Sequence, residues 1–168
     1  MRTPRLLVRL LSLVTLVGLI PLAGWVPAAQ ASTVVHDAFS FPVDEVADDI
    51  CPFPIRFSGT VSAQVEAFFD DAGNFTKVIL HFSNVLALSG NGVTLQHVER
   101  FNEFDVGFDG TGAPSTVITA GLLVHDQLPD GRTVALEVGR IVEDAATGDV
   151  TFTAGHSGDP AAFCAAFG

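Results

Sequence analysis

Two cysteines, Cys51 and Cys164, are the residues of this sequence whose chemistry depends most on the compartment of the protein. In an exported protein that has two cysteines, these most often form a disulfide with each other. The bond would close a loop of 113 residues, and in the chain-entropy model this contributes up to roughly 4 to 5 kcal/mol of stability. Two free buried thiols or a reactive nucleophile are the alternatives, but no neighbouring base marks either cysteine as activated.

The remaining chemistry-bearing residues match no catalytic or metal-binding motif. The histidines lack the paired spacing of a zinc helix or finger, so we expect most of them to be hydrated and predict no metal site. The segment DVGFDGTGAP is rich in carboxylates, but it has no EF-hand spacing, and acidic turn residues explain it. GxSxG is absent. The sequence therefore indicates no catalytic residue, no cofactor and no particular enzyme. The five histidines of the chain are His36, His81, His97, His125 and His156.

The N-terminus decides the compartment. Three arginines precede a long apolar run that Pro21 interrupts, and the small residues Ala29 and Ala31 then match a signal-peptidase site. We predict a secretory signal peptide over residues 1–31 and a secreted, extracellular product over residues 32–168 that forms a single domain. An uncleaved membrane anchor is the competing interpretation of the same run. The rest of the chain has no other apolar run of that length, so no membrane association is expected after cleavage.

Charge excludes several classes of partner. Three of the 8 basic residues and none of the 19 acidic residues lie in the predicted signal, so residues 32–168 carry 5 basic and 19 acidic side chains, a formal charge of −14. Binding to nucleic acid or to an anionic membrane requires clustered Lys and Arg. Neither partner is therefore expected, whereas cations and basic surfaces stay compatible with this charge.

Short alternating or apolar stretches, separated by Gly, Asp, Asn and Pro, fill the predicted domain. Such spacing without a helical period indicates an antiparallel all-β fold. The only helix we expect is short and C-terminal, with Asp159 as its cap and Pro160 in its first turn. We predict a single antiparallel β-barrel of about eight strands, with a β-sandwich as the alternative. The stretches are TVVHDAFSF, FSGTVSAQVEAFF, FTKVILHFS, VTLQHVERF, STVITAGLLVHD, RTVALEVGRIV and VTFTAGH.

Turn chemistry predicts how the hairpins pair. Gly131 and Gly148 suit turns with a positive φ, and the resulting registers keep apolar residues on one face. Gly121 and Gly139 oppose each other in this register and permit the bend of a small barrel. The expected pairs are Val65 with Leu80, Ala67 with Val78, Leu122 with Val138, Val124 with Leu136, and Val142 with Phe152.

This register places a cation on the apolar face. Arg140 falls between Val138 and Val142 with Ala154 opposite, and His156 opposes Val138. An isolated buried charge is costly, so Arg140 must reach solvent, pair with a carboxylate such as Glu99 or Glu103, or belong to a pocket. If the face lines the barrel interior, an apolar ligand with a negative or carbonyl group would be held by Leu122, Val138, Arg140, Phe152 and His156.

The layout also resembles a group of known sequences. A signal peptide, an early CPFPI, hairpin turns of the DGR and TGD kind and a terminal GHSGDPAAFCAAF are similar to uncharacterised secreted proteins of actinobacteria, over essentially all of the mature chain. The expected barrel is loosely similar to lipocalin-like and allene-oxide-cyclase-like barrels, although a lipocalin GxW motif is absent. The resemblance implies a secreted barrel and carries no catalytic residue with it.

Three classes of function fit these features. The first is a barrel that binds a small apolar or amphipathic ligand, and the second is an extracellular structural or interaction protein without a cavity. The third is a cofactor-free isomerase or cyclase.

The predicted cleavage can be tested through aromatic content. Trp25 lies in the signal and the chain contains no tyrosine. The secreted protein should therefore begin at Ser32 and absorb almost nothing at 280 nm, as intact-mass and absorbance measurements would show. A secreted product whose mass retains Trp25 would contradict the cleavage site.

Overall fold

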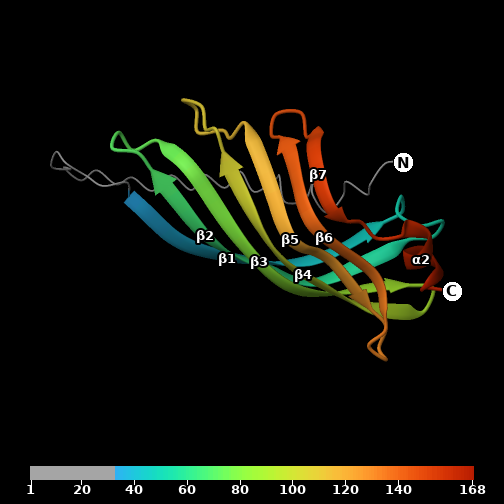
Figure 1. Ribbon diagram of the computed structural model, residues 1–168. Helices are drawn as coiled ribbons and strands as arrows, with labels where there is room; N and C mark the ends of the chain where they lie inside the picture. The colour runs from blue at the N-terminus through green and yellow to red at the C-terminus, as the bar shows by residue number, and fades with distance from the viewer. Residues whose placement is uncertain (1–32) are drawn as a thin grey trace.

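The structure is a computed structural model that describes residues 33–168, so the predicted signal peptide lies outside the described residues. Seven strands follow one another and a short helix ends the chain (Figure 1). All seven stretches with strand patterning in the sequence are strands here. The elements are β1 (Thr33–Ala47), β2 (Ile55–Phe69), β3 (Phe75–Gly90), β4 (Val93–Val106), β5 (Thr116–Gln127), β6 (Thr133–Asp144), β7 (Val150–His156) and α2 (Pro160–Ala165).

The strands form one antiparallel sheet in the order β1-β2-β3-β4-β5-β6-β7. This confirms an all-β fold with a short C-terminal helix, but with seven strands instead of about eight. Within residues 33–168 no strand pairs with the outer edge of β1 or of β7, so the sheet is not closed into a barrel, and no second sheet makes a sandwich. The edges are unequal in length, 15 residues in β1 and 7 in β7, so most of β1 would lack a partner on closure.

Most of the predicted register is confirmed. Val65 opposes Leu80, Leu122 opposes Val138, and the Val142–Phe152 pair lies across β6 and β7. The predicted pairing of Val124 with Leu136 is wrong. A bulge in β5 between Leu122 and Val124 inserts one residue, so Val124 opposes Glu137 instead.

A row of glycines lets the sheet bend at β5 to β7. Gly121 opposes Gly139 as predicted, and Gly155 extends the row onto β7. Gly121 has a φ of 142°, and a Cβ there would approach the Cα of Phe101 to 2.7 Å. Because only glycine accepts both the dihedral and the close approach, the bend is encoded at this position.

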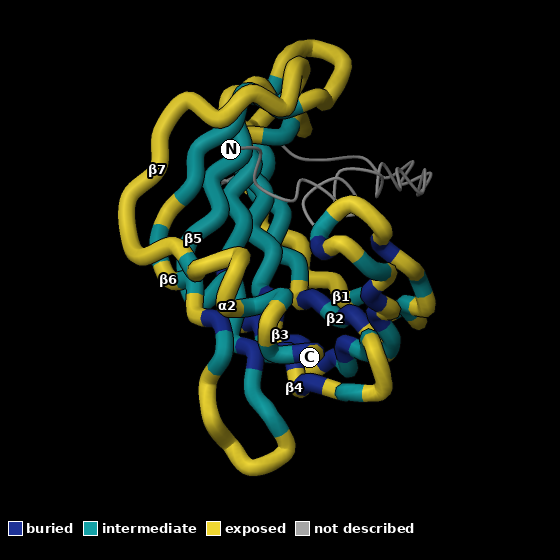
Figure 2. The backbone as a smooth tube through the Cα atoms, turned by 90° about the vertical axis from the view of Figure 1, so that its right-hand side faces the viewer, coloured by how far each residue is buried: buried dark blue, intermediate teal, exposed yellow. Residues whose placement is uncertain are grey.

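The core lies at the end of the sheet that α2 covers. Figure 2 shows the buried segments gathered around the C-terminal end of the chain, whereas β7 is exposed throughout. Phe167, directly after α2, is 1% exposed and its ring contacts those of Phe53 and Phe163. The predicted disulfide is confirmed: Cys51 and Cys164 are bonded and hold α2 against the entrance of β2.

Alternation along the strands separates two sides of the sheet. The core side carries buried apolar residues such as Ile55, Leu88 and Leu95, and the outer side carries the residues between them. The far end is the end of the sheet opposite α2, where the turns over residues 70–74, 107–115 and 145–149 lie (Figure 1). No described element covers the core side there in the way that α2 covers the other end.

Reduction of the disulfide should destabilise the protein by releasing α2. The chain-entropy model predicts a loss of up to roughly 4 to 5 kcal/mol for a loop of this length, and exposure of Phe167 would add to it. We expect a lower melting temperature in reductant, measured by circular dichroism.

The matched control is the double variant Cys51→Ser with Cys164→Ser. Its melting temperature should be lower than that of the oxidised protein and should not change with reductant. A wild-type melting temperature that is also unchanged by complete reduction would contradict the role of the disulfide.

Candidate functional site

A buried polar network crosses four strands on the core side. Nδ1 of His97 lies 2.5 Å from Oδ1 of Asp126, and Nε2 of His97 lies 3.1 Å from Oε1 of Glu99. The side-chain amide of Asn84 donates to Glu99 and its oxygen accepts the backbone N–H of Ser62. The contacts therefore link β5, β4, β3 and β2 through one chain of hydrogen bonds.

The geometry of the network sets the charge of its histidine. Both ring nitrogens of His97 face carboxylates, so both must carry a proton, which makes the ring an imidazolium. Burial alone would lower the pKa of His97, but the hydrogen bonds and charges of Asp126 and Glu99 raise it to about 9. One cation thus sits between two carboxylates.

A histidine between two carboxylates resembles a general acid–base pair, but this one has no access to a substrate. His97 is 1% exposed and Asp126 is 2% exposed. A proton-transfer group must come within hydrogen-bond reach of its substrate. We therefore interpret the network as a structural cross-link between strands.

Sequence reasoning missed this network. The sequence predicts that most histidines are hydrated, and four of the five are half-buried or exposed, but His97 is buried. The signal was present in β4, where His97 and Glu99 lie between Leu95 and Phe101 on the same, apolar face. Asp126 gave no such signal, because only the bulge in β5 turns it to the core side, opposite His97.

A second polar cluster, the acidic patch, lies on the core side near the far end. It consists of Glu103, Asp105 and Glu143. Glu103 lies between Leu80 of β3 and Thr119 of β5 in the sheet. Asp105 lies between Val78 and Val117, and Val117 in turn opposes Glu143. Three carboxyl groups are thus set among aliphatic neighbours.

The surroundings of the patch disfavour ionisation. Burial raises the pKa of Glu103 to about 7, and the charges of Asp105 and Glu143 add to this effect. Burial also raises the pKa of Asp105 to about 6. Among the described residues neither Glu103 nor Asp105 forms an ion pair with a basic side chain. The patch therefore differs from the buried network, where His97 supplies the missing positive charge.

The predicted ligand-binding residues are brought together, but not inside the molecule. They lie on the outer side of β5, β6 and β7. Along each strand their positions alternate with those on the core side, which include Gly121, Gly139 and Gly155. Val138 is 42% exposed and Phe152 is 50% exposed. Their predicted position in an interior is therefore wrong, and the five residues are Leu122, Val138, Arg140, Phe152 and His156.

Arg140 also lacks the carboxylate partners that were considered for it. Glu99 is bound to His97 and Asn84, and Glu103 lies on the opposite side of the sheet. Within residues 33–168 Arg140 makes no ion pair and is exposed. The outcome matches the alternative in which this arginine reaches solvent.

Two further features bear on ligands. Among the described residues, no group of three or more His, Cys, Asp or Glu side chains is arranged to hold a metal ion. Asp109 in the DVGFDGTGAP loop accepts hydrogen bonds from the backbone of Thr111 and Ala113, which is the expected turn chemistry. No helix within residues 33–168 has the length and hydropathy to cross a bilayer.

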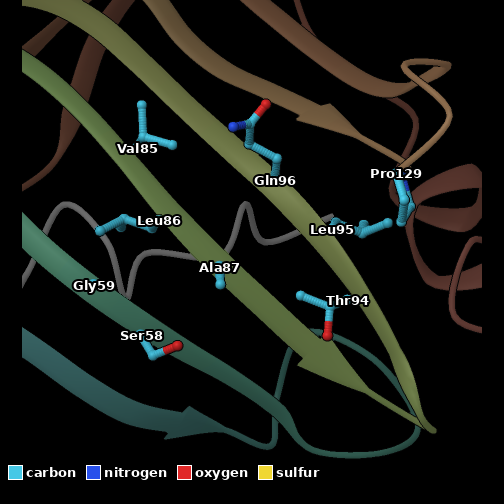
Figure 3. Close-up of a pocket in the computed structure, with 9 residues that line it drawn as sticks. All are labelled: Ser58, Gly59, Val85, Leu86, Ala87, Thr94, Leu95, Gln96 and Pro129. Atoms are coloured by element: carbon cyan, nitrogen blue, oxygen red, sulfur yellow. The ribbon is translucent and has the colours of Figure 1, made fainter.

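An open depression of about 520 Å³ lies across β2, β3 and β4. Figure 3 shows the residues that line it. Its polar side chains are those of Ser58, Thr94 and Gln96, and it contains no charged or titratable group. Gly59 and Pro129 contribute to its walls. Because it is wide open and chemically neutral, we assign it no function.

No protein-family model, curated protein or solved structure matches this chain. The functional argument therefore depends on the geometry and electrostatics described above.

Replacement of the buried cation should strongly destabilise the fold. His97→Gln would leave Asp126 and Glu99 as buried carboxylates without a counter-charge, and breaking a buried pair in this way typically costs about 3 to 5 kcal/mol. The measurement is urea unfolding at pH 7. His125→Gln is the matched control, since His125 lies on the outer side of β5 and, within residues 33–168, its side chain hydrogen-bonds only to Thr133.

The same network predicts a pH dependence. The pKa of His97 is higher in the folded state than its usual 6.5, so its contribution is complete below about 6.5 and is lost as the pH rises through about 9. Unfolding free energy should fall over this window in the wild type and less in His97→Gln. Equal pH profiles, or equal losses in His97→Gln and His125→Gln, would contradict the assignment.

Proposed function

We propose that this protein binds a small amphipathic molecule that carries a positive charge, on the core side at the far end of the sheet. The observation that carries the proposal is the acidic patch, in which Glu103 and Asp105 have raised pKa values among aliphatic side chains. Apolar walls with a few polar groups of perturbed pKa are characteristic of ligand sites.

The proposal reverses the charge of the ligand expected from the sequence. That expectation placed Arg140 and His156 in the interior, where they would hold an anionic or carbonyl group. The core side at the far end presents Glu103, Asp105 and Glu143 instead. A ligand there meets carboxyl groups, so a cation or a hydrogen-bond donor is favoured.

Magnitudes indicate how such a ligand would be held. Each roughly 100 Å² of apolar surface removed from water contributes about 2.5 kcal/mol. An ion pair at a partly exposed site contributes roughly 0 to 1 kcal/mol. The aliphatic neighbours of the patch, among them Val78, Leu80 and Val117, would therefore supply most of the affinity. The carboxyl groups would select the sign of the ligand charge.

Protonation should control binding. Burial and the nearby charges of Asp105 and Glu143 raise the pKa of Glu103 to about 7, so its carboxyl group is mostly neutral below that pH. A bound cation favours the carboxylate and so lowers this pKa. Affinity for a cationic ligand should therefore rise with pH through about 7, and binding should release protons.

A cofactor-free isomerase is the second candidate. A carboxyl group that titrates near neutrality suits a general acid or base, and Glu103 has such a pKa. Binding without turnover of any tested substrate supports the first proposal, whereas turnover that is lost in Glu103→Gln supports the second.

The direct test compares two probes with the same alkyl chain and opposite charges, decyltrimethylammonium and decanoate, by isothermal titration calorimetry at pH 8. We expect the wild type to bind the cation in preference to the anion. Glu103→Gln should weaken cation binding by about tenfold, which corresponds to about 1.4 kcal/mol.

Asp71→Asn is the matched control, because it removes one negative charge at the same end of the sheet from an exposed turn residue. It should leave the affinity unchanged. The interior hypothesis predicted from the sequence makes the opposite prediction, namely decanoate binding that is lost in Arg140→Leu. That result, or equal effects of Glu103→Gln and Asp71→Asn, would overturn the proposal.

A further inference from the structure

The two edges of the sheet differ in how they are protected against pairing with another chain. An unpaired edge presents free backbone N–H and C=O groups, and proteins commonly block such edges with charged residues or proline. β1 contains Asp37, Pro42, Asp44 and Glu45. β7, over Val150–His156, contains no Asp, Glu, Lys, Arg or Pro. Among the described strands only β6 pairs with it.

Apolar side chains surround Arg140 on the outer side next to this edge, and the carboxylate on that side of β6, Asp144, lies at the end of the strand. On the outer side Phe152 and Val138 are 50% and 42% exposed, and Val142 adjoins them. The carboxylates of β6 nearest to the middle of the strand pair, Glu137 and Glu143, lie on the core side. The combination of an unprotected edge and an apolar flank marks an interaction surface.

We propose that β7 pairs in antiparallel fashion with β7 of a second copy of this chain, about a two-fold axis. Charge restricts the part of the surface at which two copies of this chain can meet. A chain with 19 acidic side chains repels its own copies over most of its surface, so self-association requires a contact without carboxylates. β7 meets this requirement because none of its residues is acidic, whereas β1 carries three acidic residues.

Symmetry fixes the register of the pair. If all residues of Val150–His156 overlap, the two-fold axis must pass through the middle residue, Thr153. Thr153 then opposes Thr153 of the second copy, and Phe152 opposes Ala154 of the second copy. Antiparallel partners lie about 4.5 to 5.5 Å apart between Cα atoms.

The same register gives Arg140 a contact that it lacks in the single chain. Arg140 opposes Ala154, so it lies about 10 Å, two strand spacings, from Phe152 of the second copy. An arginine side chain spans this distance and can stack on the ring. In this chain the ammonium of Lys77 already lies 4.1 Å from the ring centroid of Phe68 on a neighbouring strand.

The size of the contact predicts its strength. An edge of 7 residues with one exposed phenylalanine on each copy buries less than the roughly 1,200 to 2,000 Å² of stable protein interfaces. The dimer should therefore be weak and its population should depend on concentration. This proposal does not involve the acidic patch and stands or falls independently of ligand binding.

Cysteine cross-linking tests the register. Thr153→Cys would place two thiols opposite each other at a separation that a disulfide can bridge, and the native cysteines are already bonded to each other. Oxidation should yield a covalent dimer. Thr151→Cys is the control, because in this register it opposes Gly155 of the second copy and its two thiols lie about 13 Å apart.

Sedimentation equilibrium over a range of protein concentrations tests the surface without cysteines. Wild type should shift from monomer to dimer as concentration rises, and Thr153→Lys should stay monomeric because it opposes two like charges. Val34→Lys, at an exposed position of β1, should dimerise like wild type. A wild type that is monomeric throughout, loss of the dimer in Val34→Lys alone, or equal cross-linking at positions 151 and 153 would overturn the proposal.

Discussion

The sheet depends on the buried contact between His97 and its two carboxylates. The network reaches from Asp126 on β5 to the backbone of Ser62 on β2, so it connects four of the seven strands. A shift of β5 by one residue would move Asp126 to the outer side and leave a buried imidazolium with one partner. Because an unpaired buried charge is costly, the network penalises this shift more strongly than apolar packing alone would. The bulge in β5 is the backbone feature that makes the correct register possible.

Two neighbouring parts of β4 show how environment changes the same chemical group. Glu99 is buried and bonded to His97 and Asn84. Glu103 lies four residues further along β4, away from α2 and among aliphatic residues. Burial and nearby carboxylates raise its pKa to about 7. The folded pKa of Glu103 exceeds the usual value, so ionisation destabilises the fold as the pH rises between about 4.5 and 7. This cost in stability at neutral pH is in keeping with the ligand site proposed for the far end.

The sequence predicted those features that depend on local pattern. Period-two alternation and turn residues identified all seven strands, and Gly121 opposite Gly139 followed from hairpin register. The predicted export of the chain led to the prediction of the bond between Cys51 and Cys164, which the structure confirms. The inward position of Arg140 failed for a physical reason: alternation says which residues share a face, but not which face is covered. Asp126 could not be assigned either, because a bulge changes the alternation and leaves no clear mark in the sequence.

The open sheet makes its two sides electrostatically different. On the outer side the basic residues Arg56, Lys77, Arg100 and Arg140 offset the carboxylates Asp44, Glu66 and Asp144. The core side carries carboxylates and no Lys or Arg of the strands, among them Glu99, Glu103, Asp105, Asp126, Glu137 and Glu143. A closed barrel of about eight strands would have an interior just filled by side chains or holding one small ligand, and the acidic patch would then be largely enclosed. Because β1 and β7 are not paired among the described strands, no strand closes over the core side at the far end, where the proposed ligand site lies. The proposed ligand site lies over the core side of β4, whereas the proposed second copy pairs with the free edge of β7, so neither proposed contact requires the other to be vacant.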